Sequence, residues 1–250
     1  MRGRVERLAP PAGRHLGPRH RPAREDPRHH RPVVAQHLVD PAKLIAGTKA
    51  VYGEAQYAKL YGELVPIPAG RIVTTEDGTQ LALAGRRFDF LHTPGHALHH
   101  HVIHDHGANA VFTGDTFGLS YRDFDVGGRE WVMPTTTPTH FDPDQLHASI
   151  DRILGLAPKA LFLTHYGRVT QVERLGRELH AGVRAFVEMA RRHANAPERD
   201  RVLREEMFRW LSVSLDAHGY TGDIAERHRL LDADVDLNVQ GLVHWLDRRA

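Results

Sequence analysis

Apolar residues are spaced differently in three parts of the chain. Residues 1–32 show neither a helical period nor the alternation of a strand. Short alternating runs fill residues 66–116, and helical spacing dominates from about residue 170 onward. Before the strands, residues 42–63 carry apolar side chains at helical spacing, namely Leu44, Ile45, Val51, Tyr57, Leu60 and Tyr61. The pattern predicts a helical segment, a group of strands and a helical C-terminal part.

The alternating runs predict strands joined by short turns. Two strands are expected around the turn formed by residues 76–78, and "RRFDFLHT" places Phe88 and Phe90 on the opposite face from Asp89. The string "HHVIHDHGANAVFTGD" predicts two more strands around a turn at residues 105–109. A buried strand is expected in "KALFLTH", residues 159–165. Strands interspersed with helices indicate the α/β class.

One helix among the strands has a strong start signal. In "FDPDQLHASIDRILGLAP", Asp142 is the expected N-cap, Pro143 occupies the first helical position and Gln145 completes a capping box. Its apolar stripe consists of Leu146, Ile150, Ile153 and Leu154. Three further amphipathic segments are predicted after residue 170, from the stripes Leu175, Leu179, Val183, Phe186, then Leu203, Met207, Trp210, Leu211, and finally Leu242, Val243, Trp245, Leu246.

The first 32 residues differ from the rest in composition as well as in pattern. They hold nine arginines against three acidic residues, and six prolines, in a chain whose net charge is only +2. Because proline removes backbone donors and blocks helices, we expect residues 1–32 to be a disordered or non-native arm. The abrupt change near residue 33 leads to the hypothesis that this arm is an out-of-frame translation or follows a misplaced start. The other reading frames of the DNA upstream of codon 33 test this hypothesis.

The composition excludes several kinds of site and partner. The 250 residues contain no cysteine, so any metal must be bound by histidine or carboxylate side chains. No apolar run reaches the ~18–20 residues needed to span a bilayer, and the arginine-rich N-terminus lacks the apolar core of a secretory signal. We therefore expect a cytoplasmic protein with no membrane partner. Nucleic acid is not an expected partner either, because no aromatic residue interrupts the arginines.

Three short segments place candidate metal ligands directly after predicted strands. They are "TPGH" with His96, "FTGDT" with Asp115 and "FLTHYG" with His165. Gly95 and Gly114 permit the sharp turns that would aim the first two side chains. A carboxylate can bridge two cations because it has two oxygens, and neutral imidazole suits zinc and similar metals. Each segment alone is commonly structural, but the three together point to a metal site.

In this order, the segments resemble motifs of the metallo-β-lactamase fold superfamily of metallohydrolases, over roughly residues 33–170. The resemblance implies an αββα sandwich in which His96 binds a first metal, His165 a second, and Asp115 both. It implies two zinc ions per complete site, with iron or manganese as alternatives. It also implies a metal-activated hydroxide that attacks a small-molecule ester, thioester or lactone, with Asp115 as the catalytic residue that orients the hydroxide. Residues 171–250 resemble the helical extension of some hydrolase branches, which shapes a substrate pocket or a homodimer interface.

One signature of the superfamily is missing. Its main motif, His-x-His-x-Asp-His, supplies four of seven ligands, yet the 250 residues contain no such run. The nearest strings, "HVIHDH" at residues 101–106 and "HLGPRH" at residues 15–20, have the wrong spacing or lack the acid. We therefore expect an incomplete sandwich without its N-terminal portion, and weak or absent metal binding. Apart from His96, the histidines of residues 93–107 are predicted to be packing or solvent-exposed residues, with His100 on the strand that follows.

Two other functions remain open on the sequence alone. A non-catalytic, histidine-rich protein would chelate metal loosely through residues 92–106 and the N-terminal histidines, and replacing His165 would then have no effect. A nucleic-acid binder would use the arginine-rich arm, and its affinity would fall with salt. The substrate-binding residues stay unknown, because Tyr121, Arg122 and His140 fit a surface loop better than a substrate contact.

Overall fold

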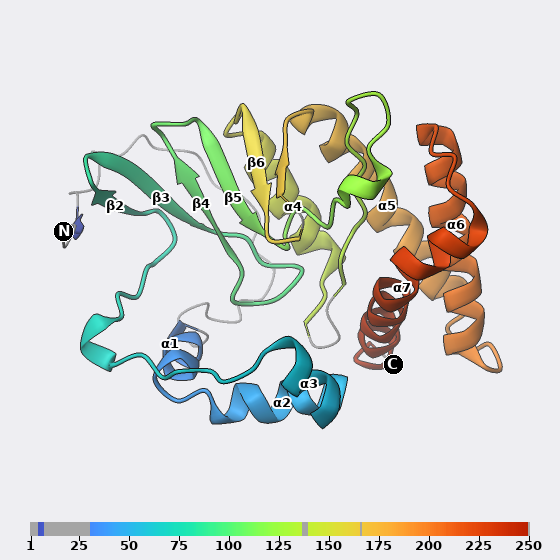
Figure 1. Ribbon diagram of the computed structural model, residues 1–250, viewed down its shortest axis with the longest axis horizontal. Coiled ribbons are helices and arrows are strands. Elements are labelled where there is room, and N and C mark those ends of the chain that lie inside the picture. The colour runs from blue at the N-terminus through green and yellow to red at the C-terminus, as the bar shows by residue number, and fades with distance from the viewer. Residues whose placement is uncertain (1–4, 8–30, 137–139, 166, 250) are drawn as a thin grey trace. The chain divides into compact units, whose positions relative to one another are not determined.

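The computed structural model describes residues 5–7, 31–136, 140–165 and 167–249. By its internal contacts the chain divides into two compact units, residues 11–76 and residues 1–10 with 77–250. The larger unit carries the strands and the C-terminal helices (Figure 1). The string "HLGPRH" at residues 15–20 lies outside the described residues.

The smaller unit is helical over most of its described length. α1 spans Arg31–Val39, α2 spans Ala42–Tyr52 and α3 spans Glu54–Leu60, and the short 3-10 helix η2 covers Ala69–Arg71. α2 and α3 form the helical segment expected over residues 42–63, and Gly53, with a φ of +80°, divides it into two helices. Of the apolar positions in this segment, Tyr57 is buried, whereas Leu44 and Leu60 are exposed.

Within the described residues, seven strands form one sheet in the order β1-β2-β3-β4-β5-β6-β7 (Figure 1). Neighbouring strands are antiparallel, except that β5 and β6 are parallel because the chain crosses between them through α4. The strands are β1 Val5–Arg7, β2 Thr79–Leu83, β3 Arg86–His92, β4 His101–Asp105, β5 Ala110–Gly114, β6 Ala160–Leu163 and β7 Gly167–Val169.

The expected strands β2, β3, β4, β5 and β6 are confirmed, but the other strand expected before the turn at residues 76–78 does not form. Residues 72–76, where that strand is expected, have no regular secondary structure. β2 pairs with β3 on one edge and with β1 on the other, so neither edge is left for residues 72–76. The strand that occupies the second of these edges is Val5–Arg7, which lies within the N-terminal arm that was expected to be disordered.

The helix α4, Pro143–Leu154, begins where its sequence signals place it. The Asp142 carboxylate accepts a hydrogen bond from the backbone N–H of Gln145 at 3.0 Å, as an N-cap does. The Gln145 side-chain amide donates to the other carboxylate oxygen at 3.0 Å, instead of accepting from the Asp142 backbone N–H as it would in a capping box. Leu146, Ile150 and Ile153 are buried in the same core as residues of β4, β5 and β6.

The C-terminal part is helical, as predicted. It consists of α5 Val172–Arg192, α6 Arg199–His218 and α7 Ile224–Asp247, and α6 and α7 pack against each other and against α5 (Figure 1). The third apolar stripe marks only the end of α7, which begins at Ile224 because Asp223 caps it. None of the described helices is long and apolar enough to cross a membrane. The fold is α/β with a C-terminal helical extension.

Asn238, buried on α7, ties the C-terminal helices to the loop before α4. Its side-chain oxygen accepts hydrogen bonds from the backbone N–H of Thr136 at 2.7 Å and from the Thr136 hydroxyl at 2.9 Å. We expect Asn238→Ala to lower the free energy of unfolding by about 2–3 kcal/mol, because it leaves a buried N–H without its acceptor. Urea denaturation measures this effect. Gln240→Ala, at an exposed position of the same helix, is the control and should change it by less than about 0.5 kcal/mol; equal losses would contradict the assignment.

Candidate metal centre

The sheet topology explains why the three predicted ligand segments meet. β3 and β5 run in the same direction because each is antiparallel to β4, and β6 is parallel to β5. The carboxyl ends of these three strands therefore share one edge of the sheet, and His96, Asp115 and His165 follow them in the chain. Residues far apart in the sequence are brought to one place by this arrangement.

Each oxygen of the Asp115 carboxylate faces at least one histidine side chain. His96 Nε2 is 3.5 Å from Asp115 Oδ2, and His165 Nε2 is 3.5 Å from Asp115 Oδ1. All three predicted residues are thus in contact distance, with one histidine on each oxygen. Metal binding by these residues stays a prediction, but the arrangement has the form of a carboxylate able to bridge two cations.

His100 is a fourth member of the site, and the sequence analysis missed it. Its Nε2 lies 3.7 Å from Asp115 Oδ2, on the same side as His96. His100 precedes β4 instead of lying on it, because the chain turns at residues 97–100 and the His100 N–H bonds to the Ala97 carbonyl. The strand prediction for His100 is therefore wrong. The i, i+4 spacing of the two histidines is a signal in the sequence that could have suggested a shared face.

Threonine hydroxyls orient both imidazoles on the Oδ2 side. The Thr135 hydroxyl lies 2.8 Å from His96 Nδ1 and donates to the Asp115 carbonyl, so it is placed to accept the Nδ1 proton. The Thr116 hydroxyl donates to a backbone carbonyl and lies 3.5 Å from His100 Nδ1. A proton on Nδ1 leaves the lone pair on Nε2, which faces Asp115, and this is the tautomer that a metal ligand requires.

The environment keeps these imidazoles neutral. Burial lowers the pKa of His96, although the nearby Asp115 carboxylate acts in the opposite direction. Burial and the charges of neighbouring histidines lower the pKa of His100 to about 3. A neutral ring can coordinate a metal without first losing a proton.

The residues present fit a divalent cation such as zinc. Within the described residues, Asp115 Oδ1 is buried without a hydrogen-bond partner, which is costly for a carboxylate oxygen unless a cation satisfies it. His96, His100 and Asp115 each offer one ligand atom, and these atoms lie within 4.8 Å of one another. Two imidazoles and one carboxylate are three of the ligands typical of a catalytic zinc site, which keeps a further position open.

Two glycines hold the ligand loops close to their neighbours. Gly95 has a φ of +122°, and a Cβ built on it would lie 2.2 Å from the backbone nitrogen of Leu146 in α4. Gly114 has a φ of +55°, and its Cβ would lie 3.0 Å from the His100 ring. The turns that aim His96 and Asp115 therefore need glycine for space as well as for conformation.

The C-terminal helix α7 brings an acid to the outer side of the site. Tyr121 donates a short hydrogen bond to Asp234 of α7. Burial raises the pKa of Asp234, although the hydrogen bond from Tyr121 and the charge of His165 act in the opposite direction. Arg122 contacts Ser120 and Asp125, and His140 is exposed. Tyr166 lies outside the described residues.

Known proteins are similar to this chain over more than half of its length. The family profile described as the metallo-beta-lactamase superfamily matches residues 19–165, which is more than half of the chain and begins within the N-terminal arm. A curated metallo-beta-lactamase fold-containing protein of Sulfurisphaera tokodaii is 31% identical over 130 residues, which cover 51% of this chain and 45% of that protein. The chain thus spans about half the length of this relative.

Solved structures share the fold. An archaeal metallo-beta-lactamase superfamily protein from Sulfolobus tokodaii has a TM-score of 0.52 and 21% identity, with 86% of this chain and 68% of that chain covered. A metallo-beta-lactamase family protein from Thermus thermophilus has a TM-score of 0.50 and 18% identity, covering 86% and 63% respectively. The structures show the likeness of fold, and the profile match over residues 19–165 shows the family. The chain belongs to the metallo-beta-lactamase superfamily.

Proposed function

We propose that this protein is a metal-dependent hydrolase whose substrate is a small-molecule ester, thioester or lactone. The observation that carries the proposal is the Asp115 carboxylate, which has His96 and His100 on Oδ2 and His165 on Oδ1. Membership of the metallo-beta-lactamase superfamily supports the same chemistry.

The chain's own residues would hold and orient the reacting groups. Asp115, His96 and His100 would bind a first cation, with the ring orientations set by Thr135 and Thr116. His165, whose side chain is 46% exposed, would face a second cation or the substrate from the Oδ1 side. A divalent cation held there would polarise a substrate carbonyl and make a water molecule more acidic.

The two sides of Asp115 are expected to differ in affinity. Among the described residues, the Oδ2 side offers two imidazoles and the Oδ1 side offers one. Because affinity rises with the number of protein ligands, we expect the Oδ2 side to bind metal first. Because His100 adds a ligand, the first cation should bind more tightly than is expected from His96, Asp115 and His165 alone.

The experiment is a metal-dependent hydrolysis assay on the full chain. The protein is stripped with a chelator, reloaded with Zn²⁺, Mn²⁺ or Fe²⁺, and assayed on a nitrophenyl ester, an acyl thioester and a lactone. We expect hydrolysis only in the reloaded protein. Rates that are equal with and without metal would contradict the proposal.

His165→Asn separates this function from loose chelation by scattered histidines. We expect the rate of the reloaded protein to fall at least about tenfold, because the Oδ1 side of Asp115 loses its imidazole. His244→Asn, at an exposed position of α7, is the matched control and should leave the rate unchanged. An equal rate in both variants would show that His165 takes no part in the reaction, as loose chelation by scattered histidines predicts.

A further inference from the structure

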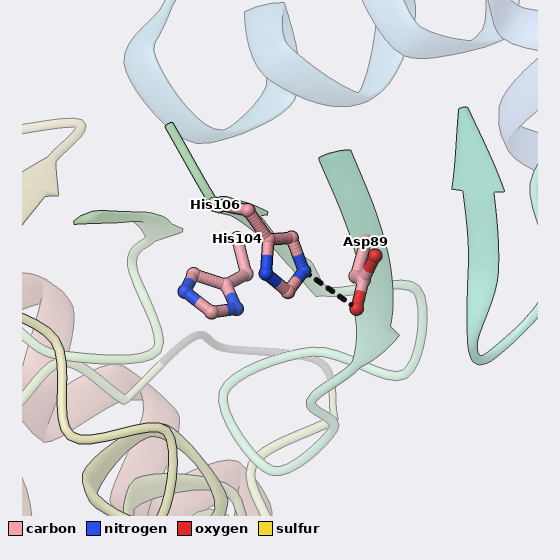
Figure 2. A group of neighbouring side chains, drawn as sticks. All are labelled: Asp89, His104 and His106. Carbon is pink, nitrogen blue, oxygen red and sulfur yellow. Dashed lines mark ion pairs between the residues drawn. The ribbon is translucent and has the colours of Figure 1, made fainter. Parts of the chain in front are cut away.

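A second group of potential ligands, Asp89, His104 and His106, lies on β3 and at the end of β4, apart from the Asp115 centre. Figure 2 shows the two imidazole rings side by side, with His106 turned toward Asp89. We propose that these three side chains form a separate site for a divalent transition metal such as Zn²⁺. Neither the proposed hydrolase site nor the superfamily motifs include them.

The register of the sheet places the three residues on one face. Asp89 and His104 are direct partners across the antiparallel strands β3 and β4. His106 is two residues beyond His104, and its N–H bonds to the Arg87 carbonyl at 3.2 Å, so the strand pairing continues to it. Since side chains alternate along a strand, His106 and His104 project to the same side as Asp89.

The distances suit a metal ion. His106 Nε2 lies 2.9 Å from Asp89 Oδ2, the His104 and His106 ring centroids are 4.3 Å apart, and one ligand atom of each residue lies within 4.8 Å of the others. Ligands at about 2.0–2.2 Å in a tetrahedron are roughly 3.3 Å from one another. Small side-chain rotations therefore close the group around a cation, without a change in the backbone.

Neighbouring groups hold His104 and the turn that contains His106 in place. His104 is 7% exposed, and its Nε2 lies 3.4 Å from the side-chain oxygen of Asn109. If Nε2 carries the proton toward this oxygen, Nδ1 keeps the lone pair for a metal. Asp105 holds the turn that follows by accepting from the N–H groups of Gly107 and Ala108.

Arg87 now occupies the position of the cation. Its Nη2 lies 2.8 Å from His106 Nε2, and its Nε lies 3.5 Å from Asp89 Oδ1, a buried oxygen with no hydrogen-bond partner in the described part of the chain. The Arg87 side chain is 46% exposed, so it can swing into solvent when a metal enters. Metal and guanidinium should therefore compete for Asp89 and His106.

In the experiment, the full chain carrying Asp115→Asn is titrated with Zn²⁺ and with Co²⁺. The Asp115→Asn substitution is made first because it should weaken metal binding at the first centre. Calorimetry gives the affinity, and the visible spectrum of Co²⁺ reports its ligands. We expect one bound equivalent that Asp89→Asn and His106→Asn each weaken at least about tenfold. His244→Asn is the control and should not change the affinity.

Arg87→Gln should change the Zn²⁺ affinity in the opposite direction from Asp89→Asn and His106→Asn. Removing the competing cation should tighten Zn²⁺ binding about two- to fivefold, as expected for a partly exposed ion pair. Thermal unfolding without metal checks that every variant is folded. The proposal is overturned if Asp89→Asn and His106→Asn bind metal as tightly as the background, or if Arg87→Gln binds it no more tightly. A missing hydrolase activity would leave this outcome unaffected, because Asp115 is already replaced.

Discussion

Replacing Gly95 by alanine is expected to lower the free energy of unfolding by about 3–5 kcal/mol. Gly95 has a φ of +122°, and its new Cβ would lie 2.2 Å from the Leu146 nitrogen and 2.4 Å from the Leu146 Cα. These are backbone atoms of α4, so no side-chain rotation relieves the overlap.

The turn at Gly95 cannot move away from α4 without further losses. The Gly95 carbonyl accepts from the Asp142 N–H at 2.8 Å, and the Pro94 carbonyl accepts from the Ser149 hydroxyl at 2.6 Å. Both bonds join the ligand loop to the first turns of the helix. The substitution should therefore also move His96 away from Asp115 and weaken metal binding.

Urea denaturation of Gly95→Ala and Gly78→Ala separates overlap from backbone strain. Gly78 also has a positive φ, +76°, but no atom lies within 4 Å of its Cβ position. Gly78→Ala should thus lower the free energy of unfolding by only about 1 kcal/mol, which is the cost of placing alanine at a positive φ. Equal losses in the two variants would show that contact with α4 does not determine the effect.

Asp115→Asn is expected to reduce Zn²⁺ affinity at the first centre by about 100-fold or more, and to abolish the proposed hydrolysis with it. The amide keeps the size of the side chain but removes its negative charge and one of its two oxygens. Both sides of the centre lose their common ligand, so the effect should exceed that of His165→Asn, which changes one side.

Binding and stability must be measured together for this variant. Asp123→Asn, an exposed acid in the 3-10 helix Arg122–Phe124, is the control for charge and should bind Zn²⁺ like the parent protein. With chelator present, Asp115→Asn should unfold within about 1 kcal/mol of the parent, because no bond to a metal is then lost. Unchanged Zn²⁺ affinity in Asp115→Asn would remove Asp115 from the centre.

The local signals in the sequence predicted the elements that depend on near neighbours. α4 begins at Pro143 because the Asp142 carboxylate accepts the backbone N–H of Gln145 three residues later, and Pro143 at the first helical position has no N–H to satisfy. The strands β3 to β6 follow their alternation and turn residues. The candidate ligands His96, Asp115 and His165 were found for a similar reason, since each directly follows a strand and lies in a short recognisable segment.

The tertiary structure decided the contacts that join distant segments. His100 belongs to the Asp115 site because a turn places it before β4, and Thr135 reaches His96 across 39 residues. The edge of β2 pairs with Val5–Arg7 in preference to residues 72–76. The sequence by itself determined the α/β class, the helical C-terminal part and three candidate ligands, since these follow from periodicity and local motifs. The fourth site residue, His100, the second histidine group and the Asn238 anchor required the structure, because a turn before β4, strand register and helix packing bring these residues to their partners, and no local motif predicts those contacts.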